Sequence, residues 1–282
     1  MYSEKQRASI QRGWSNALNA NIYEAYAQTY PLYRESGQHL LRLAQMRPGM
    51  TVVDLACGTG IVTAQILEAL AGSGAVIGLD CSAEMLAIAR GKLASVRFMQ
   101  SSAEQCSAVL GAETIDRVIC NSAFWQMDTR ATLAAVHHIL KPAGCLAFNL
   151  GTGTRFTHQS GAHPESLTAL MRRIALEEYG LTFPSRSGGK LPRSLLAATP
   201  DEVRALLVAN SFQVVHHEIL EIDYTQEGIY EFLKIPVINA HYLPGSEYPV
   251  GKEIVEKAYQ RCEKPFCAVG IWHYFVAEKI PA

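Results

Sequence analysis

The run from Val52 to Thr63, VVDLACGTGIVT, combines an acidic side chain with two closely spaced glycines. The β-branched residues before Asp54 suit a strand buried on both faces, and Gly58 and Gly60 let the backbone approach a ligand closely. A helix that begins after such a turn directs its N-terminal amide groups at that ligand. The run therefore predicts the turn of a nucleotide-cofactor site.

The same run departs from the dinucleotide-binding fingerprint. That fingerprint has a third glycine, which permits close packing of the helix on the strand. This chain has Thr63 at that position. A nicotinamide-dependent enzyme is therefore disfavoured, but it stays open as an alternative.

Three further segments follow in an alternating pattern of strands and helices. The first, Val76 to Asp80, ends on a carboxylate that can accept hydrogen bonds from both hydroxyls of a ribose. The second, Gln100 to Gln105, and the third, Val118 to Gln126, each follow or contain a predicted strand. The carboxyl ends of parallel strands meet at one edge of a sheet, so all of these segments are expected to border one crevice.

In order and spacing, these segments resemble the class I S-adenosylmethionine (SAM) dependent methyltransferases of the small-molecule type, from about Met50 to Leu150. The resemblance implies that Asp80 holds the SAM ribose, that Met85 packs on adenine, and that Ser102 stands where an aspartate usually meets the adenine edge. It also places Ala56 where the family has glycine. The implied cofactor residues from this region are Asp54, Ala56, Cys57, Gly58, Gly60, Asp80, Cys81, Met85, Ser102, Ala103, Glu104, Asn121 and Ser122.

Aromatic and apolar residues recur at helical spacing from about Ser9 to Gln45. In the resembled family such helices lie over the cofactor, and an aromatic hydroxyl often reaches the SAM carboxylate. Tyr26 and Tyr33 are the first choices for that role, ahead of Tyr23 and Tyr30. The alternative is that these tyrosines form an apolar stripe buried against the sheet.

The predicted fold is α/β, a Rossmann-like doubly wound sheet with a closing antiparallel strand, N-terminal helices and an inserted helical lid. Four regions are expected: a helical cap at 1–48, the SAM-binding core at 49–151, a lid insertion at 152–211, and C-terminal strands at 212–282 with an insertion at 223–260. Glycine-rich stretches at Gly151–Thr154 and Ser185–Lys190 suggest hinges for the lid.

The composition narrows the class of partner. The 282 residues carry a formal net charge of -1, which disfavours a nucleic-acid partner and favours a small-molecule substrate. Neither a signal core nor a spanning apolar run is evident, so a cytoplasmic enzyme is expected. The seven cysteines have no C-x-x-C spacing and are interpreted as reduced thiols. No metal site is expected, because Asn121 and Asn149 stand where metal-dependent relatives have aspartates.

Methyl transfer requires alignment of the acceptor and exclusion of water, and it dictates no particular catalytic side chain. A histidine could serve as a base, and His158 and His163 in the predicted lid are the first to test. His241 beside Tyr242 and the late-strand residues His216, His217 and His273 stay open. We therefore predict a biosynthetic methyltransferase acting at O or C of a natural-product or lipid-like acceptor. The alternative of another class is a SAM-fold protein that does not methylate, either a cyclase or a noncatalytic partner subunit.

Overall fold

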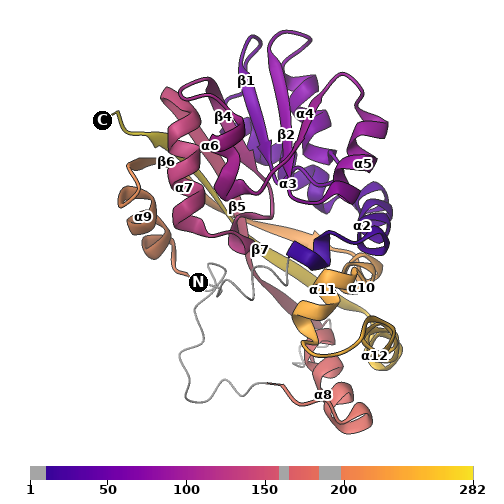
Figure 1. Cartoon of the computed structure of the whole chain (residues 1–282). Coiled ribbons are helices and arrows are strands. Elements are labelled where there is room, and N and C mark those ends of the chain that lie inside the picture. Colours follow the sequence, from indigo (N-terminus) through magenta and orange to yellow (C-terminus); the bar gives the residue numbers. More distant parts are fainter. Residues whose placement is uncertain (1–10, 159–164, 184–197, 282) are drawn as a thin grey trace.

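A seven-stranded sheet forms the centre of the molecule (Figure 1). The computed structural model describes residues 11–158, 165–183 and 198–281. The strand order is β3-β2-β1-β4-β5-β7-β6, and only β7 runs antiparallel to its neighbours. The strands are β1 (Thr51–Leu55), β2 (Ala75–Asp80), β3 (Arg97–Gln100), β4 (Ile115–Cys120), β5 (Leu140–His158), β6 (Phe212–Tyr224) and β7 (Phe266–Lys279).

Helices cover both faces of this sheet, as a doubly wound fold requires. Successive residues of a strand point to opposite faces, so Val52 contributes to one apolar core and Val53 to the other. The first core packs under α3 (Leu32–Leu43), α4 (Ile61–Ala69) and α5 (Ala83–Lys92). The second lies under α6 (Cys106–Val109), α7 (Thr129–Ile139) and α9 (Pro200–Val208). The predicted fold class is confirmed.

The N-terminal region predicted as helical divides into two helices. Asn16 caps α2 (Ala17–Thr29), where its side-chain oxygen accepts a hydrogen bond from the amide of Leu18 at 2.9 Å. Pro31 then stands at the N-cap of α3, because proline interrupts the hydrogen bonding of a continuous helix. The break lets α2 and α3 lie at an angle to one another beside the ends of the strands (Figure 1).

The prediction that the lid begins at 152, with a hinge at Gly151–Thr154, is wrong. β5 continues to His158 and pairs with β7 as far as Phe266. Gly151 packs closely there against β7, because a Cβ on it would lie 3.2 Å from the Trp272 ring, which is a tight contact. The second predicted hinge, Ser185–Lys190, lies outside the described residues. α9 is not part of a lid either, because Val203 and Leu207 are buried in the second core.

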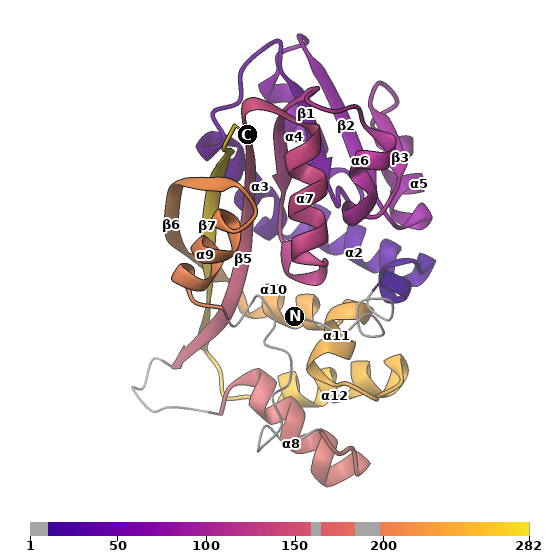
Figure 2. The same ribbon diagram turned by 60° about the vertical axis from the view of Figure 1, so that its left-hand side comes forward.

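A helical layer covers the carboxyl ends of the parallel strands (Figure 2). It contains α8 (Leu167–Tyr179) from one insertion and α10 (Gln226–Leu233), α11 (Pro236–Tyr242) and α12 (Tyr248–Arg261) from the other. Glu178 of α8 accepts hydrogen bonds from Lys257 and Arg261 of α12, so the two insertions form one layer. We call these four helices the cover. Within the described ranges, no helix is long and apolar enough to cross a membrane.

Candidate active site

A cavity lies between the carboxyl ends of β1, β2 and β4 and the cover. Most of the residues expected from the sequence lie in its wall. These are Tyr33, Ala56, Gly58, Asp80, Cys81, Met85, Ser102, Ala103, Glu104, Asn121 and Ser122. Four others do not line it, and they are Tyr26, Asp54, Cys57 and Gly60.

Asp80 joins the end of β2 to the glycine turn. Its Oδ2 accepts a hydrogen bond from the amide of Gly58, and its Oδ1 accepts one from the amide of Ser82, both at 2.8 Å. The residue is 8% exposed, and burial raises its carboxyl pKa. Each carboxylate oxygen has more than one acceptor position, so these two bonds leave capacity for two further donors. Asp80 is thus a rigid acceptor pair at the cavity wall.

The glycine turn bends through left-handed backbone. Ala56 has φ 59°, Gly58 φ 55° and Gly60 φ 86°. Glycine adopts this region without strain, whereas the methyl group of Ala56 makes it costly. Gly60 is the N-cap of α4 and packs toward Leu93 rather than toward the cavity. A Cβ added to Gly60 would stand 3.2 Å from the Leu93 side chain. Its role is therefore to shape the turn.

Two residues of the turn lie behind the cavity wall. The side chain of Cys57 is buried, and burial holds its thiol pKa well above the usual value, which makes it an inert filler. Asp54 is 1% exposed, and its Oδ2 accepts a hydrogen bond from Thr63 Oγ1 at 2.5 Å. Burial raises the pKa of Asp54 to about 7; the bond from Thr63 opposes this shift, and the negative charge of Asp80 adds to it. Thr63 thus anchors a buried carboxyl where a dinucleotide fingerprint has glycine.

Two asparagines fix the segment that follows β4. Asn149 of β5 donates from Nδ2 to Asn121 Oδ1 at 2.7 Å, and its own Oδ1 accepts from the amide of Ser122 at 2.6 Å. Asn121 in turn donates to the backbone oxygen of Tyr33 at 3.3 Å. This network holds Ser122 at φ 61°, and its buried Oγ has no partner within the described chain. The described residues contain no cluster of three or more metal-binding side chains.

The adenine side predicted from the sequence is also held in place. Met85 is 2% exposed, and its amide donates to the Ser82 hydroxyl at 3.1 Å, which caps α5. Glu104 accepts a hydrogen bond from the amide of Asp128 at 2.8 Å, so it links the segment after β3 to the start of α7. Ser102 lies between Met85 and Glu104 in the sequence, and it lines the cavity with its neighbour Ala103.

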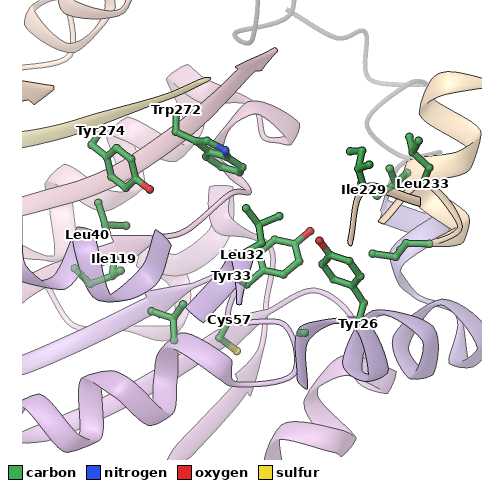
Figure 3. Close-up of a cluster of buried hydrophobic side chains, with 14 of the residues drawn as sticks. Tyr26, Leu32, Tyr33, Leu40, Cys57, Ile119, Ile229, Leu233, Trp272 and Tyr274 are labelled. Atoms are coloured by element: carbon green, nitrogen blue, oxygen red, sulfur yellow. The ribbon is translucent and has the colours of Figure 1, made fainter. Parts of the chain in front are cut away.

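The tyrosine nearest the glycine turn is Tyr23, not Tyr26. A Cβ on Gly58 would stand 3.9 Å from the Tyr23 hydroxyl, and the Tyr23 ring lies 5.0 Å from that of Tyr33. Tyr26 stacks on Tyr30 inside the core, with ring centroids 5.0 Å apart. Figure 3 shows the hydroxyl ends of Tyr26 and Tyr33 turned toward one another, away from Cys57. The preference for Tyr26 as a cavity residue is therefore not supported.

The half of the cavity beneath the cover is mainly aromatic. The members of this wall could not be predicted from the sequence. They come from the segment after β4, from β5, β6 and β7, and from the cover, most of which are far apart in the chain. The members are Trp125, Gly151, Gly153, Thr154, Tyr224, Phe232, Ile238, His241, Tyr242 and Trp272. Of the predicted histidines, His241 lines the cavity, whereas His163 and the side chain of His158 lie outside the described residues. In the described wall, the charged side chains are Asp80 and Glu104.

Known structures share this architecture. A candidate methyltransferase from Bacillus halodurans superposes with a TM-score of 0.56 at 14% identity, covering 88% of this chain and 100% of that chain. The [4+2]-cyclase SpnF superposes with a TM-score of 0.51 at 15% identity, covering 87% of this chain and 80% of that one. At these identities the likeness shows the fold, which is the Rossmann-like fold of the class I methyltransferases.

The sequence comparison identifies the domain. Residues 52–144 match the family described as methyltransferase domain. A malonyl-[acyl-carrier protein] O-methyltransferase from Pectobacterium atrosepticum is 33% identical over 46% of this chain and 48% of its own length. A trans-aconitate 2-methyltransferase from Deinococcus radiodurans is 34% identical over 54% and 56%. The chain thus spans about half the length of these curated relatives, and it contains a class I SAM-dependent methyltransferase domain.

Proposed function

We propose that the protein is a SAM-dependent methyltransferase that methylates O or C of a small natural-product or lipid-like acceptor. The observation that carries this proposal is that one cavity joins two unlike halves. One half has the acceptor pair of Asp80 and the buried Met85, and the other has the aromatic wall beneath the cover. A cofactor in the first half would present its reactive end to an acceptor in the second.

The residues of the first half suit SAM. The free lone pairs of Asp80 would accept hydrogen bonds from the ribose hydroxyls, Met85 would pack on adenine, and Ser102 would meet the adenine edge. Tyr23 and Tyr33 would lie above the glycine turn, where the aromatic hydroxyl of Tyr23 can reach a carboxylate. Bound there, SAM supplies an electrophilic methyl group carried on a positively charged sulfur. The task of the chain is to orient the acceptor and exclude water.

Charge favours SAM over a nicotinamide dinucleotide. The described wall carries Asp80 and Glu104 but no lysine or arginine. Acidic side chains suit a cationic sulfonium and repel a pyrophosphate.

The names of the relatives point to small acceptors. They include enzymes that act on malonyl-[acyl-carrier protein] and trans-aconitate, and a demethylmenaquinone methyltransferase from Lactococcus lactis that is 35% identical over 34% of this chain. The mainly apolar second half of the cavity supports an acceptor of limited polarity here.

Transfer of a labelled methyl group tests the proposal. The full chain would be incubated with methyl-labelled SAM and a panel of hydroxyl, carboxyl and activated-carbon acceptors, with formation of S-adenosylhomocysteine measured in parallel. Labelled product is expected from the wild type and not from Asp80→Ala at the same cofactor concentration. Cofactor binding without methyl transfer to any acceptor class would instead support the cyclase or noncatalytic alternative.

A further inference from the structure

His241 is the imidazole that faces the cavity from the cover. We propose that it is the general base of the reaction, and that the acceptor is a flat, uncharged molecule with an acidic hydroxyl, such as a phenol or an enol. The proposal rests on the proposed function and deepens it, because it names the proton acceptor and the class of substrate.

The structure places His241 opposite the segment after β4. Asn19 of α2 accepts a hydrogen bond from the amide of Val237 at 3.1 Å and thereby fixes the start of α11. The His241 ring meets the Trp125 ring edge to face, with centroids 5.6 Å apart. Trp125 in turn donates from its indole nitrogen to the backbone oxygen of Ser122 at 3.1 Å. One aromatic ring therefore separates the imidazole from the segment that is expected to border the methyl group.

The environment keeps this imidazole available as a base. Desolvation of the ring by the packing around it lowers the pKa of His241, although the residue keeps solvent exposure, and the positive charge of Arg172 on α8 lowers the pKa further. The ring borders the cavity, and within the described chain neither ring nitrogen has a hydrogen-bond partner; Tyr242 of the same helix touches it only edge to face. A neutral imidazole with a free nitrogen is ready to accept a proton near neutral pH.

The other histidines with described contacts are engaged away from the cavity. His39 and His216 both pair with Glu218, and His137 lies against the backbone oxygen of Ile280. His217 and His273 share a contact of 3.2 Å between ring nitrogens. None of these five is in the described wall. Among the histidines whose side chains the structure describes, His241 is therefore the one that lines the cavity.

The wall also indicates what the base would act on. A carboxylate acceptor is already ionised at neutral pH, so it needs no base. The described wall itself has no lysine or arginine to pair with a carboxylate, and Arg172 acts on His241 from outside that wall. A phenol or enol is planar and uncharged and carries a hydroxyl whose proton must leave. Trp125, Tyr224 and Trp272 offer aromatic faces for such a ring.

The proposed step balances in protons and electrons. The acceptor hydroxyl gives its proton to a ring nitrogen of His241, and the oxygen lone pair forms the new bond to the methyl carbon. The bond between that carbon and sulfur breaks, and its electron pair stays on sulfur, which becomes neutral. The imidazolium then releases its proton to water.

The test compares His241→Gln with the wild type on naphthols of graded acidity. A general base contributes roughly a hundredfold or more, so kcat is expected to fall by at least that factor, while the Kd for S-adenosylhomocysteine is unchanged. The wild-type rate should rise with pH through the pKa of His241 and then level off, and the variant should lack that rise. Imidazole added to His241→Ala should restore activity. The matched control is His138→Gln on α7, which is exposed and outside the described wall, and it should behave like the wild type.

A second readout needs no turnover. 4-Nitrophenol absorbs visible light only as its anion, so its apparent pKa in the cavity can be measured by absorbance. We expect a lower value in the wild type than in His241→Gln, because the imidazole takes the proton. An equal apparent pKa, or unchanged kcat and pH profile in the variant, would overturn the role of His241. Methylation of trans-aconitate but of no naphthol would overturn the acceptor class and leave the proposed function intact. Failure to bind SAM would overturn the proposed function itself.

Discussion

Asp54 should make the stability of the folded protein depend on pH in an unusual direction. Burial raises its pKa from 3.8 to about 7, so the folded state retains a proton that the unfolded chain has already lost. The contribution of the protonated carboxyl is complete below pH 4 and is lost as the pH rises to about 7. Asp54→Asn removes the titration while keeping an oxygen that can accept the hydrogen bond from Thr63.

The magnitude follows from the shift. A difference of about 3 pH units, at about 1.4 kcal/mol for each, corresponds to about 4 kcal/mol. The free energy of unfolding of Asp54→Asn, minus that of the wild type, should therefore grow by up to about 4 kcal/mol between pH 4 and pH 8. It should stay constant above that range, where Asp54 is ionised in both states.

Urea denaturation at half-unit steps of pH, on the chain without cofactor, measures this difference. Asp116→Asn is a control of opposite sign. Partial burial acts to raise the pKa of Asp116, but its hydrogen bond from Lys141 prevails and lowers it, so its contribution is lost as the pH falls. A difference between Asp54→Asn and the wild type that is flat from pH 4 to pH 8, or that shrinks, would refute the account of this buried carboxyl.

Further substitutions test the glycine turn and the tyrosines of α2. Tyr23→Phe should weaken binding of S-adenosylhomocysteine by roughly twofold to tenfold, which is the range expected for one hydrogen bond, whereas Tyr26→Phe should leave binding unchanged. Calorimetry on both variants measures this difference. A larger loss of affinity in Tyr26→Phe than in Tyr23→Phe would restore Tyr26 to the site. Ala56→Gly should raise the free energy of unfolding by about 1 kcal/mol, because Ala56 has φ 59°; a loss of similar size in urea denaturation would mean that packing of its methyl group outweighs the backbone strain.

The sheet could be predicted from the sequence because local signals mark it. Val52 and Val53 precede a carboxylate and a glycine turn, and a second apolar run ends on the carboxylate of Asp80. The positions of these strands and of the cofactor edge therefore follow from short stretches of sequence. The length of β5 could not be predicted. Gly151 and Gly153 resemble hinge residues in isolation, and only the pairing with β7, which packs Trp272 closely against Gly151, shows that they belong to a strand.

The choice between Tyr23 and Tyr26 failed for a similar reason. Both tyrosines lie on α2, and helical spacing alone does not tell which side of that helix faces the glycine turn. The orientation is set by contacts with distant elements, such as Phe232 of α10, whose ring lies 5.7 Å from that of Tyr26. The aromatic wall and the place of His241 in it could not be predicted for the same reason, because only tertiary packing brings the helices of the cover over the ends of the strands.

Calorimetric titration of the full chain with SAM tests the central claim most directly. The account predicts micromolar-scale Kd values for SAM and S-adenosylhomocysteine, because both share the ribose and adenine contacts. Asp80→Ala should raise both Kd values at least tenfold, since each charge-assisted hydrogen bond is worth roughly 1.5–3 kcal/mol. Tight binding of NADH with no response to either sulfur compound, or unchanged affinity in folded Asp80→Ala, would contradict the assignment of this cavity as a SAM site.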